Sequence, residues 1–330
     1  MDERIQGAHM KVGIVLPIEQ ADGATGPPSY GEIRDIALAA EAAGLDSLWV
    51  FDHLLFRSDG VTTGIHECWT VLAAIAEATS RVQLGTIVMC TAFRNPALLA
   101  KMAATLDHIS GGRLVLGVGC GWHDPEYEAF GYPTDHKVGR FEEALTVIRS
   151  LIREGRADLD GRWVQARDAV LMPPARPDLP ILIAAKRPRM LELTARHADA
   201  WNAAWFGAPD ERLATLRADV LAACGTVGRD PTTLDITVGV TIRYPDLGPT
   251  HAAGLMEAGE ADNAALPPEA ALPPETGEPA LTGSDEEIAA GLAAHAAMGA
   301  SHLIAALEPT TPASVARLAA AVRLAGPALE

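Results

Sequence analysis

The chain lacks the features that would place it in a membrane or on a nucleic acid. Charged residues, glycine or proline interrupt every apolar run before it reaches the roughly 18 residues that a membrane span needs. Basic residues are also scarce, since Lys and Arg number 26 against 43 Asp and Glu, which gives a net charge of −17. Such a chain offers no broad basic surface to a phosphate backbone. We therefore expect a small-molecule substrate and neither a membrane nor a nucleic-acid partner.

Cysteine is rare and its spacing shows no paired motif. The four cysteines are Cys68, Cys90, Cys120 and Cys224, and no two of them form a CxxC pair. The N-terminal residues also lack the apolar core of a signal peptide. Both observations indicate a cytoplasmic protein with reduced thiols.

Three common catalytic motifs are missing as well. His66, Cys68, His123 and Glu126 are of metal-ligating types, but their spacing is not that of a zinc site, and HExxH is absent. The G-x-S-x-G elbow of serine hydrolases is absent too. The glycines at 117–121 fail as a dinucleotide fingerprint, because Trp122 stands where G-x-G-x-x-G needs its third glycine. We therefore expect no catalytic metal and no serine hydrolase site.

What the chain does contain is a regular alternation of strand-like and helix-like segments. β-branched and aliphatic runs alternate with helical patterns from Lys11 onward, which is typical of βα units around a parallel sheet. Eight units in 330 residues favour a (β/α)8 TIM barrel. The competing doubly wound sheet usually has fewer strands and a nucleotide site at its first βα turn. The predicted strands are residues 11–18, 45–54, 81–90, 113–121, 180–185, 199–205, 234–244 and 301–307, and the predicted helices are residues 29–44, 68–80, a segment from Pro96, 141–155, 187–198, 209–225, 284–297 and 312–325.

Two segments differ in composition from this pattern. Residues 1–10 are polar, and we expect them to be an added remnant or a loose arm outside a single domain of residues 11–330. Residues 246–281 are rich in Pro, Ala, Gly and Glu, which indicates a flexible insertion before the last helix-strand-helix unit. A lid over substrate and a passive linker are both consistent with it. Regular structure resumes at Ser284, which forms a capping box with Glu287.

The carboxyl ends of the strands are the positions that would face an active site in a barrel. Asp52 and His53 follow the second predicted strand, and a neutral histidine can pass a proton at near-neutral pH. Because neighbouring residues of a strand point to opposite faces, only one of the two is expected to face the pocket. We favour His53 as the catalytic residue, while the alternative is that it only caps its strand.

Two further strand ends suggest binding roles. Lys186 and Arg187 stand between a strand and a helix N-terminus, where backbone N–H groups and two cations would hold a phosphate. The alternative is a solvated surface turn. The glycines at 117–121 would allow a planar ring to lie against the end of the fourth strand. We expect Glu126, Tyr127 and Glu128, which follow, to order a loop rather than to catalyse.

Four stretches in this order make the chain resemble the bacterial luciferase-like monooxygenase superfamily, flavin- and F420-dependent oxidoreductases. They are GLDSLWVFDHL (44–54), RVQLGTIV (81–88), FRNPALLAKMAATLDHISGGRLVLGVGCGWHDPEYEAFG (93–131) and PILIAAKRPRMLELTARHADAWN (180–202). The resemblance implies a TIM barrel, an enzyme using reduced FMN or F420, and, as is common in the superfamily, a homodimer. It also implies that a separate flavin or F420 reductase supplies the cofactor.

The resemblance further implies roles for individual residues. The isoalloxazine would lie against the end of the third strand, which in the family often includes a non-proline cis peptide, and the phosphate would bind in the turn after the fifth. His53 matches a histidine that serves proton transfer or ring positioning in the F420-dependent branch. The implied cofactor-binding residues are Asp52, Gly85, Thr86, Ile87, Val88, Gly117, Gly119, Gly121, Ala184, Ala185, Lys186 and Arg187.

Trp122 departs from one branch of the family. F420-dependent sugar-phosphate dehydrogenases of this fold carry a glutamate there, so that activity is not expected. Large aromatic side chains instead suggest an apolar or aromatic substrate cavity, formed by Phe56, Trp69, Trp122 and Trp205, unless they only pack the interior. We slightly favour F420-dependent hydride transfer. FMNH2-dependent monooxygenation with O2 and a non-catalytic flavin-binding role are the alternatives.

Overall fold

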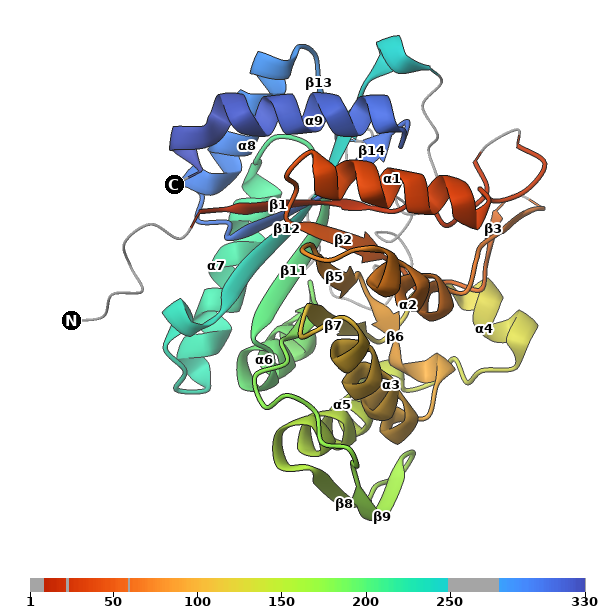
Figure 1. Ribbon diagram of the computed structural model, residues 1–330. Coiled ribbons are helices and arrows are strands. Elements are labelled where there is room, and N and C mark those ends of the chain that lie inside the picture. The colour runs from red at the N-terminus through yellow and green to blue at the C-terminus, as the bar shows by residue number, and fades with distance from the viewer. Residues whose placement is uncertain (1–8, 22–23, 59, 249–278, 330) are drawn as a thin grey trace.

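The computed structural model describes residues 9–21, 24–58, 60–248 and 279–329 (Figure 1). Within these residues, eight parallel strands pair in the order β1-β2-β5-β7-β10-β11-β12-β14, and β14 pairs with β1 to close a barrel. The predicted TIM barrel is confirmed. Its strands are β1 (Lys11–Val15), β2 (Ser47–Val50), β5 (Gln83–Thr86), β7 (Leu114–Gly119), β10 (Ile181–Ala184), β11 (Ala200–Phe206), β12 (Asp235–Arg243) and β14 (His302–Glu308).

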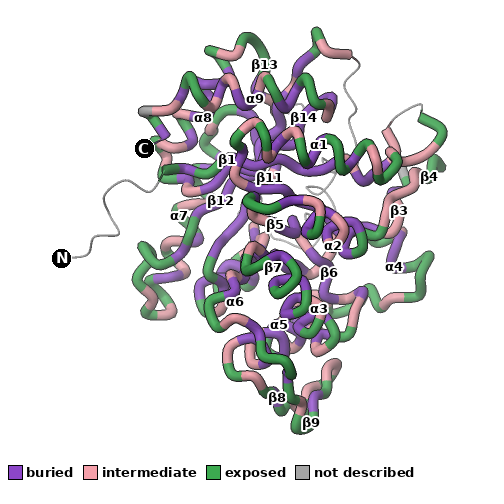
Figure 2. Tube along the Cα trace, in the orientation of Figure 1, coloured by how far each residue is buried: buried purple, intermediate pink, exposed green. Residues whose placement is uncertain are grey.

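Helices surround the barrel, with their apolar faces turned inward. Figure 2 shows buried strands at the centre and exposed outer helix surfaces. The capping box predicted at Ser284 is present, and Ser29 forms a second one with Glu32. The barrel helices are α1 (Tyr30–Ala42), α2 (Cys68–Ala78), α3 (Pro96–Ile109), α5 (Lys137–Glu154), α6 (Pro188–His197), α7 (Glu211–Thr226), α8 (Asp285–Ala297) and α9 (Pro312–Ala325).

Several short elements decorate this frame. The hairpin β3–β4 follows β2 and lies on the same side of the molecule as α4 (Figure 1). The hairpin β8–β9 follows the C-terminal end of α5. The short helix α4 contacts β3. The bounds are β3 (Leu55–Ser58), β4 (Val61–Gly64), β6 (Met89–Cys90), α4 (Asp124–Phe130), β8 (Arg156–Asp160), β9 (Gln165–Val170) and β13 (Leu281–Thr282), with 3-10 turns at Thr91–Phe93, Pro231–Thr233, Pro245–Leu247 and Gly326–Ala328.

The barrel interior is filled by side chains rather than open. Trp49 of β2 is fully buried and lies over Gly85 of β5, where an added methyl group would come within 2.2 Å of the indole ring. Ser47 accepts a hydrogen bond from Trp49 Nε1 at 2.7 Å, and its hydroxyl lies 2.7 Å from His302 Nε2 of β14. These contacts link three strands, so the barrel forms a packed core that supports the strand ends above it.

The structure describes only part of the two segments predicted to lie outside the regular barrel pattern, residues 1–10 and 246–281. Met10 belongs to the core, since it is 2% exposed and its N–H donates to the carbonyl of Leu329. Residues 1–8, and 249–278 of the predicted insertion at 246–281, lie outside the described residues. Among the helices that can be described, none is both long enough and apolar enough to cross a bilayer.

Candidate functional site

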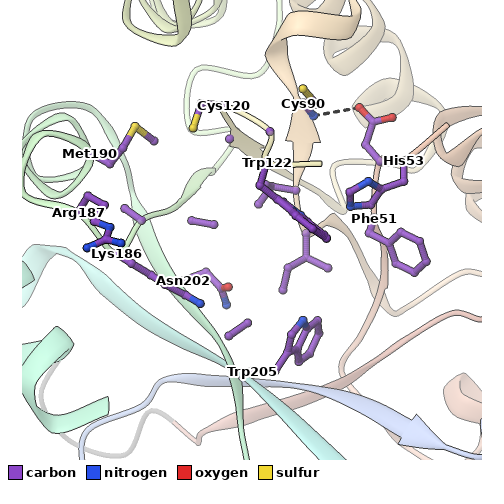
Figure 3. Close-up of a pocket in the computed structure, with 18 of the residues that line it drawn as sticks. Phe51, His53, Cys90, Cys120, Trp122, Lys186, Arg187, Met190, Asn202 and Trp205 are labelled. Carbon is purple, nitrogen blue, oxygen red and sulfur yellow. Dashed lines mark hydrogen bonds between the residues drawn. The ribbon is translucent and has the colours of Figure 1, made fainter. Parts of the chain in front are cut away.

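A cavity of about 190 Å³ opens at the carboxyl ends of the barrel strands, where the active sites of TIM barrels lie. Its lining comes from the ends of β2, β7, β10 and β11, from the segment after β5 and from α4 and α6, and it is mostly apolar. Figure 3 shows Lys186 and Arg187 on the side opposite His53. The lining residues are Phe51, Asp52, His53, Ile87, Val88, Cys90, Gly119, Cys120, Gly121, Trp122, Glu126, Ala184, Ala185, Lys186, Arg187, Met190, Asn202, Ala204 and Trp205.

His53 is held in this cavity by a buried carboxylate. Its Nδ1 lies 2.8 Å from Glu126 Oε1, and the other oxygen of Glu126 accepts the N–H of Leu54 at 2.8 Å. The Glu126 side chain is 1% exposed. A carboxylate at Nδ1 selects the tautomer with its proton on Nδ1, as in the catalytic triads. Nε2 makes no hydrogen bond to the described residues and remains the nitrogen that can exchange a proton.

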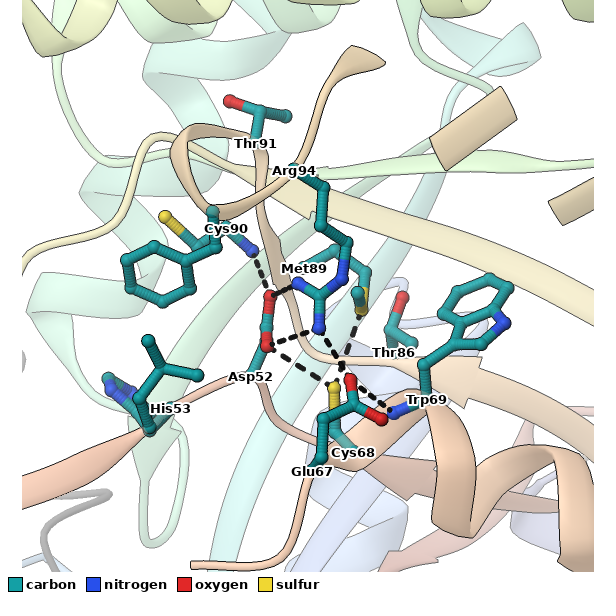
Figure 4. A network of polar contacts seen from close by, with 12 residues as sticks. Asp52, His53, Glu67, Cys68, Trp69, Thr86, Met89, Cys90, Thr91 and Arg94 are labelled. Carbon is teal, nitrogen blue, oxygen red and sulfur yellow. Dashed lines mark hydrogen bonds and ion pairs between the residues drawn. The ribbon is translucent and has the colours of Figure 1, made fainter. Parts of the chain in front are cut away.

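Asp52 and His53 both line the cavity, although only one of them was expected to face it, because both follow β2 rather than lie within it. The Asp52 carboxylate is directed toward Cys90 and Arg94 (Figure 4). One of its oxygens accepts the N–H of Cys90 at 2.9 Å, and the guanidinium of Arg94 binds both oxygens. Asp52 also accepts a hydrogen bond from the Cys68 thiol at 3.3 Å. The carboxylate is thus engaged by protein donors, so its contribution to the site is to hold the segment after β5 against β2.

This network also contains the described group that most resembles a metal site. Ligand atoms of Asp52, Glu67 and Cys68 lie within 4.8 Å of one another. Arg94 donates to Asp52 and, at 2.6 Å, to Glu67. Its guanidinium supplies the positive charge that a metal ion would bring, so the geometry is that of an ion-pair network.

Aromatic side chains form one wall of the cavity. The Trp122 ring meets the His53 ring edge-on, with centroids 5.4 Å apart, and Trp205 lines the same space. The Phe56 ring packs against the His53 ring, with centroids 4.4 Å apart, and Phe56 does not line the cavity. Trp69 lies near Glu67 and is not in the lining either (Figure 4). Two of the four predicted substrate-pocket residues therefore face the cavity.

Of the cofactor-binding residues predicted on the third and fourth strands, some line the cavity and others lie deeper in the barrel wall. Ile87 and Val88 line the cavity and are joined by a non-proline cis peptide, as the resemblance implied. Thr86 lies deeper, where its hydroxyl donates to the carbonyl of Gly117 at 2.8 Å. The inner positions, Gly85, Thr86 and Gly117, are therefore in the barrel wall beneath the cavity, outside its lining.

Gly119 and Gly121 line the cavity, but their lack of a side chain serves protein packing. At Gly121 the backbone has φ of +73°, and an added methyl group would lie 1.9 Å from the Tyr127 hydroxyl. At Gly119 it would lie 2.6 Å from Val88. The Tyr127 hydroxyl donates to the carbonyl of Cys120 at 2.7 Å. Gly121 therefore lets α4, and Glu126 with it, dock against the end of β7, while Gly119 makes room for Val88.

The basic turn lies at the start of α6. Ala184, Ala185, Lys186 and Arg187 all line the cavity, so the four residues predicted to contact the phosphate lie together. Arg187 is the N-cap of α6, and among the described residues no side chain caps that end of the helix. The first backbone N–H groups of α6 and two cationic side chains thus meet at one edge of the cavity, which is a favourable setting for an anion.

The buried thiols nearby are not activated. Burial raises the pKa of Cys90 to about 12. Burial also raises the pKa of Cys68 well above its ordinary value, with the charge of Asp52 adding to the effect. Both remain protonated at neutral pH, so neither has the thiolate character of a nucleophile.

Sequence reasoning assigned no site role to four polar or sulfur-containing lining residues, namely Cys90, Cys120, Met190 and Asn202. Asn202 Nδ2 donates to Thr237 at 2.9 Å, while Oδ1 makes no hydrogen bond to the described residues. It also did not connect Glu126 to His53. The available signal was only positional, because Asn202 lies within a predicted strand that approaches the same edge as His53.

The chain has relatives among curated proteins. A phthiodiolone/phenolphthiodiolone dimycocerosates ketoreductase from Mycobacterium sp. (strain JLS) is 37% identical over 59% of this chain and 56% of its own length. The pyrimidine monooxygenase RutA from Methylorubrum extorquens (strain ATCC 14718 / DSM 1338 / JCM 2805 / NCIMB 9133 / AM1) is 34% identical over 58% of this chain and 56% of its own length. The chain thus spans little more than half the length of the curated relatives that it matches.

A solved structure and a family model complete the comparison. An F420-dependent secondary alcohol dehydrogenase, in complex with an F420-acetone adduct, superposes with a TM-score of 0.73, at 20% identity, over 96% of this chain and 99% of the other. That likeness supports the fold. Residues 10–246 match the model of the luciferase-like monooxygenases. The chain therefore belongs to the luciferase-like monooxygenase family.

Proposed function

We propose that this protein is an oxidoreductase that binds a reduced flavin-type cofactor, F420 in the favoured form, in the cavity beside His53. The observation that carries the proposal is the contact between His53 Nδ1 and the buried Glu126, at 2.8 Å, which leaves Nε2 available in a mostly apolar cavity. A histidine oriented in this way is suited to act as a general acid or base on a bound substrate.

The lining residues fit such a cofactor. The N-terminus of α6 with Lys186 and Arg187 would hold the phosphate. Ile87 and Val88 would lie against the ring, and Asn202 Oδ1, which makes no hydrogen bond to the described residues, would accept one from a ring N–H. Reduced F420, when bound, supplies a hydride, whereas reduced FMN activates O2.

The chain's own residues would then divide the remaining work. Glu126 keeps the His53 ring in place, and His53 Nε2 gives or takes the proton at the substrate atom that changes its bonding. Trp122, Trp205 and Phe51 exclude water and favour an apolar or aromatic substrate. A cytoplasmic location, a homodimer and a separate reductase that supplies the cofactor belong to the same proposal.

One alternative is an FMNH2-dependent monooxygenase. The family's name and the relationship to pyrimidine monooxygenase RutA favour it, and the apolar walls suit a reaction that must exclude water. A flavin-binding protein without catalysis is a further alternative, against which the oriented His53 argues.

Equilibrium titration with FMN and with F420, each oxidised and reduced, tests these alternatives. We expect micromolar binding of F420 with weaker binding of FMN. The reverse order would favour the monooxygenase, and binding of neither would contradict the proposed function. The same titration on Arg187→Ala should weaken FMN more than riboflavin, since only FMN carries the phosphate. Equal weakening would contradict the phosphate assignment.

A further inference from the structure

A second cavity lies beside the first at the carboxyl ends of the barrel strands. It has a volume of about 240 Å³ and is bounded by the ends of β1 and β14 and by α1. Among the described residues, only Phe51 lines both cavities. Phe51 follows β2 and is 2% exposed. A single aromatic side chain is thus the shared wall of the two cavities.

Phe51 lies on the side of the first cavity where His53 is. Its ring centroid is 6.0 Å from that of His53 and 6.2 Å from that of Phe56, so the ring is packed against two neighbouring rings. Figure 3 shows Phe51 next to His53, with Lys186 and Arg187 across the cavity. A substrate that reaches His53 from the side away from the basic turn therefore meets the Phe51 ring.

The size of the first cavity limits what it can hold. Its volume of about 190 Å³ is below the roughly 300–1,000 Å³ typical of pockets for drug-sized ligands. The proposed function places both a cofactor ring and the reacting group of the substrate there. The rest of the substrate needs further space, and the second cavity provides it on the His53 side.

The wall of the second cavity is largely apolar. It includes Val15 and Leu16 from the end of β1, Ile36 from α1, and Leu307 and Pro309 from the end of β14. Such a wall suits hydrocarbon or an aromatic ring.

The acidic side chains of this wall are already engaged by the protein. Glu308 accepts a hydrogen bond from Arg243 Nε at 2.7 Å, and Glu32 accepts one from the N–H of Ser29 at 2.8 Å. Glu19 is engaged as well. A ligand in this cavity is therefore stabilised by burial of its apolar surface.

A third cavity also adjoins the first, but its chemistry is different. It has a volume of about 240 Å³ and shares Cys120 with the first cavity. Arg94, Lys137 and Arg140 are in its lining. Burial of hydrocarbon against these charged side chains would remove them from water at a cost. Of the two neighbouring cavities, the second is therefore the one suited to an apolar group.

We propose that Phe51 is a specificity-determining residue, and that the second cavity is the subsite for the unreactive, apolar part of the substrate. The inference deepens the proposed function and rests on it, because the reacting group would lie beside His53. It assigns the substrate class: uncharged molecules in which a slender segment joins the reacting group to a bulkier apolar group. The slender segment passes the Phe51 ring, while the bulkier group stays in the second cavity.

Isothermal titration calorimetry of the full chain, with F420 or FMN present in oxidised form if either binds, tests this with three probes. The probes are 2-phenylethanol, 4-phenylbutan-1-ol and 6-phenylhexan-1-ol, in which the hydroxyl can contact His53. We expect 6-phenylhexan-1-ol to bind at least about thirtyfold more tightly than 2-phenylethanol, since each buried methylene is worth about fourfold in affinity. A gain below about threefold would overturn the inference.

Three variants locate the gain. Ala306→Leu and Ile36→Phe narrow the second cavity from β14 and from α1, and we expect the gain to fall below about threefold while 2-phenylethanol still binds. Ala92→Leu is the matched control, because it narrows the third cavity instead, and it should retain the gain. Survival of the gain in both second-cavity variants, or its loss in Ala92→Leu, would mean that the phenyl group binds elsewhere.

A change of specificity tests Phe51 itself. 3,3-Dimethyl-6-phenylhexan-1-ol carries two methyl groups on the slender segment, and we expect the wild type to bind it at least about tenfold more weakly than 6-phenylhexan-1-ol. Phe51→Ala widens the junction and should bind the two within about threefold, with Phe51→Leu intermediate. Partial unfolding would not produce such a gain of binding. Equal binding by the wild type, or an unchanged preference in both variants, would contradict the role of Phe51.

Failure of this inference can be told apart from failure of the proposed function. If F420 or FMN binds but the probes show no gain with length, the subsite is wrong and the proposed function stands. If the gain depends on Ala306 and Ile36 but neither cofactor binds, the proposed function is wrong, and with it the assignment of the bound molecule as a substrate.

Discussion

At the scale of single residues, the chemistry of the first cavity depends on the contact between His53 and Glu126. Glu126 comes from α4, 73 positions after His53, and reaches it because Gly121 lets Tyr127 pack against the end of β7. The buried carboxylate has two acceptor oxygens and uses one on the His53 ring and one on the Leu54 backbone. Ring and backbone are thereby fixed relative to each other, which is what a positioned acid or base requires.

Removal of the His53 side chain should lower turnover while leaving the affinity for the cofactor nearly unchanged. We expect His53→Ala to keep cofactor affinity within a few-fold and to lower turnover by more than about tenfold. Added imidazole should restore part of the lost turnover. Glu126→Gln keeps an acceptor for Nδ1 and should lose less than Glu126→Ala. The control is His66→Ala, because His66 contacts the carbonyl of Pro28 and lies outside the cavity. Unchanged turnover in His53→Ala would remove His53 from the mechanism.

At the scale of elements, the Arg94 network joins three parts of the chain. Arg94 lies just after the turn Thr91–Phe93, Asp52 follows β2, and Glu67 is the N-cap of α2. The Arg94 side chain is 11% exposed and Asp52 is 1% exposed. The segment that carries Ile87 and Val88 is thus fixed at its far end by an ion pair withdrawn from water.

Arg94→Leu should therefore cost far more stability than loss of an exposed arginine. Without Arg94 the Asp52 charge is buried and unpaired, so we expect the free energy of unfolding to fall by about 3–5 kcal/mol. Arg196→Leu removes an exposed pair with Glu192 within one helix and should change it by less than about 1 kcal/mol. Urea unfolding of both variants measures the difference. Equal losses would contradict a buried role for the Arg94 pair.

The elements themselves differ in how well the sequence predicts them. The eight barrel strands and their helices follow from long apolar periodicities and from caps such as Ser284. The hairpins β3–β4 and β8–β9 were not predicted, because their strands are short and partly exposed and so lack an apolar stripe. The helix α4 has only seven residues, too few to show a helical period.

At the scale of the whole molecule, the order of strands and helices along the chain predicts the barrel, but it does not predict which side chains contact one another at the carboxyl ends of the strands. Eight βα units bring His53 and the turn at Lys186 and Arg187 to one edge, so those positions could be predicted from spacing. The role of Glu126 and the pairing of Arg243 with Glu308 depend on loop conformation and strand register, which residue types alone do not encode. Trp69 and Phe56 show the converse, since aromatic character did not reveal that they face away from the cavity.

The closure of the barrel also has a pH dependence that can be measured. His302 of β14 is buried, and its Nε2 lies 2.7 Å from the Ser47 hydroxyl oxygen of β2. Because that oxygen accepts a hydrogen bond from Trp49 Nε1, the Ser47 hydroxyl proton is donated to the neutral imidazole of His302. Burial, with a smaller effect from the charge of Lys11, lowers the pKa of His302 from 6.5 to about 3. The unfolded chain takes up this proton near pH 6.5 and the folded chain only near pH 3.

Stability supplied by the neutral His302 is therefore complete above about pH 6.5 and is lost as the pH falls toward 3, by at most about 1.4 kcal/mol per pH unit. Carboxylates elsewhere also destabilise the fold in acid, so the wild-type curve alone does not isolate this effect. We expect the stability difference between the wild type and His302→Gln to be constant above pH 7 and to shrink steadily between about pH 6 and 4, measured by urea unfolding. His108→Gln, which changes an exposed histidine of α3, should leave a curve parallel to the wild type. A difference for His302→Gln that stays constant across this range would mean that the barrel accepts a charged imidazole at its centre.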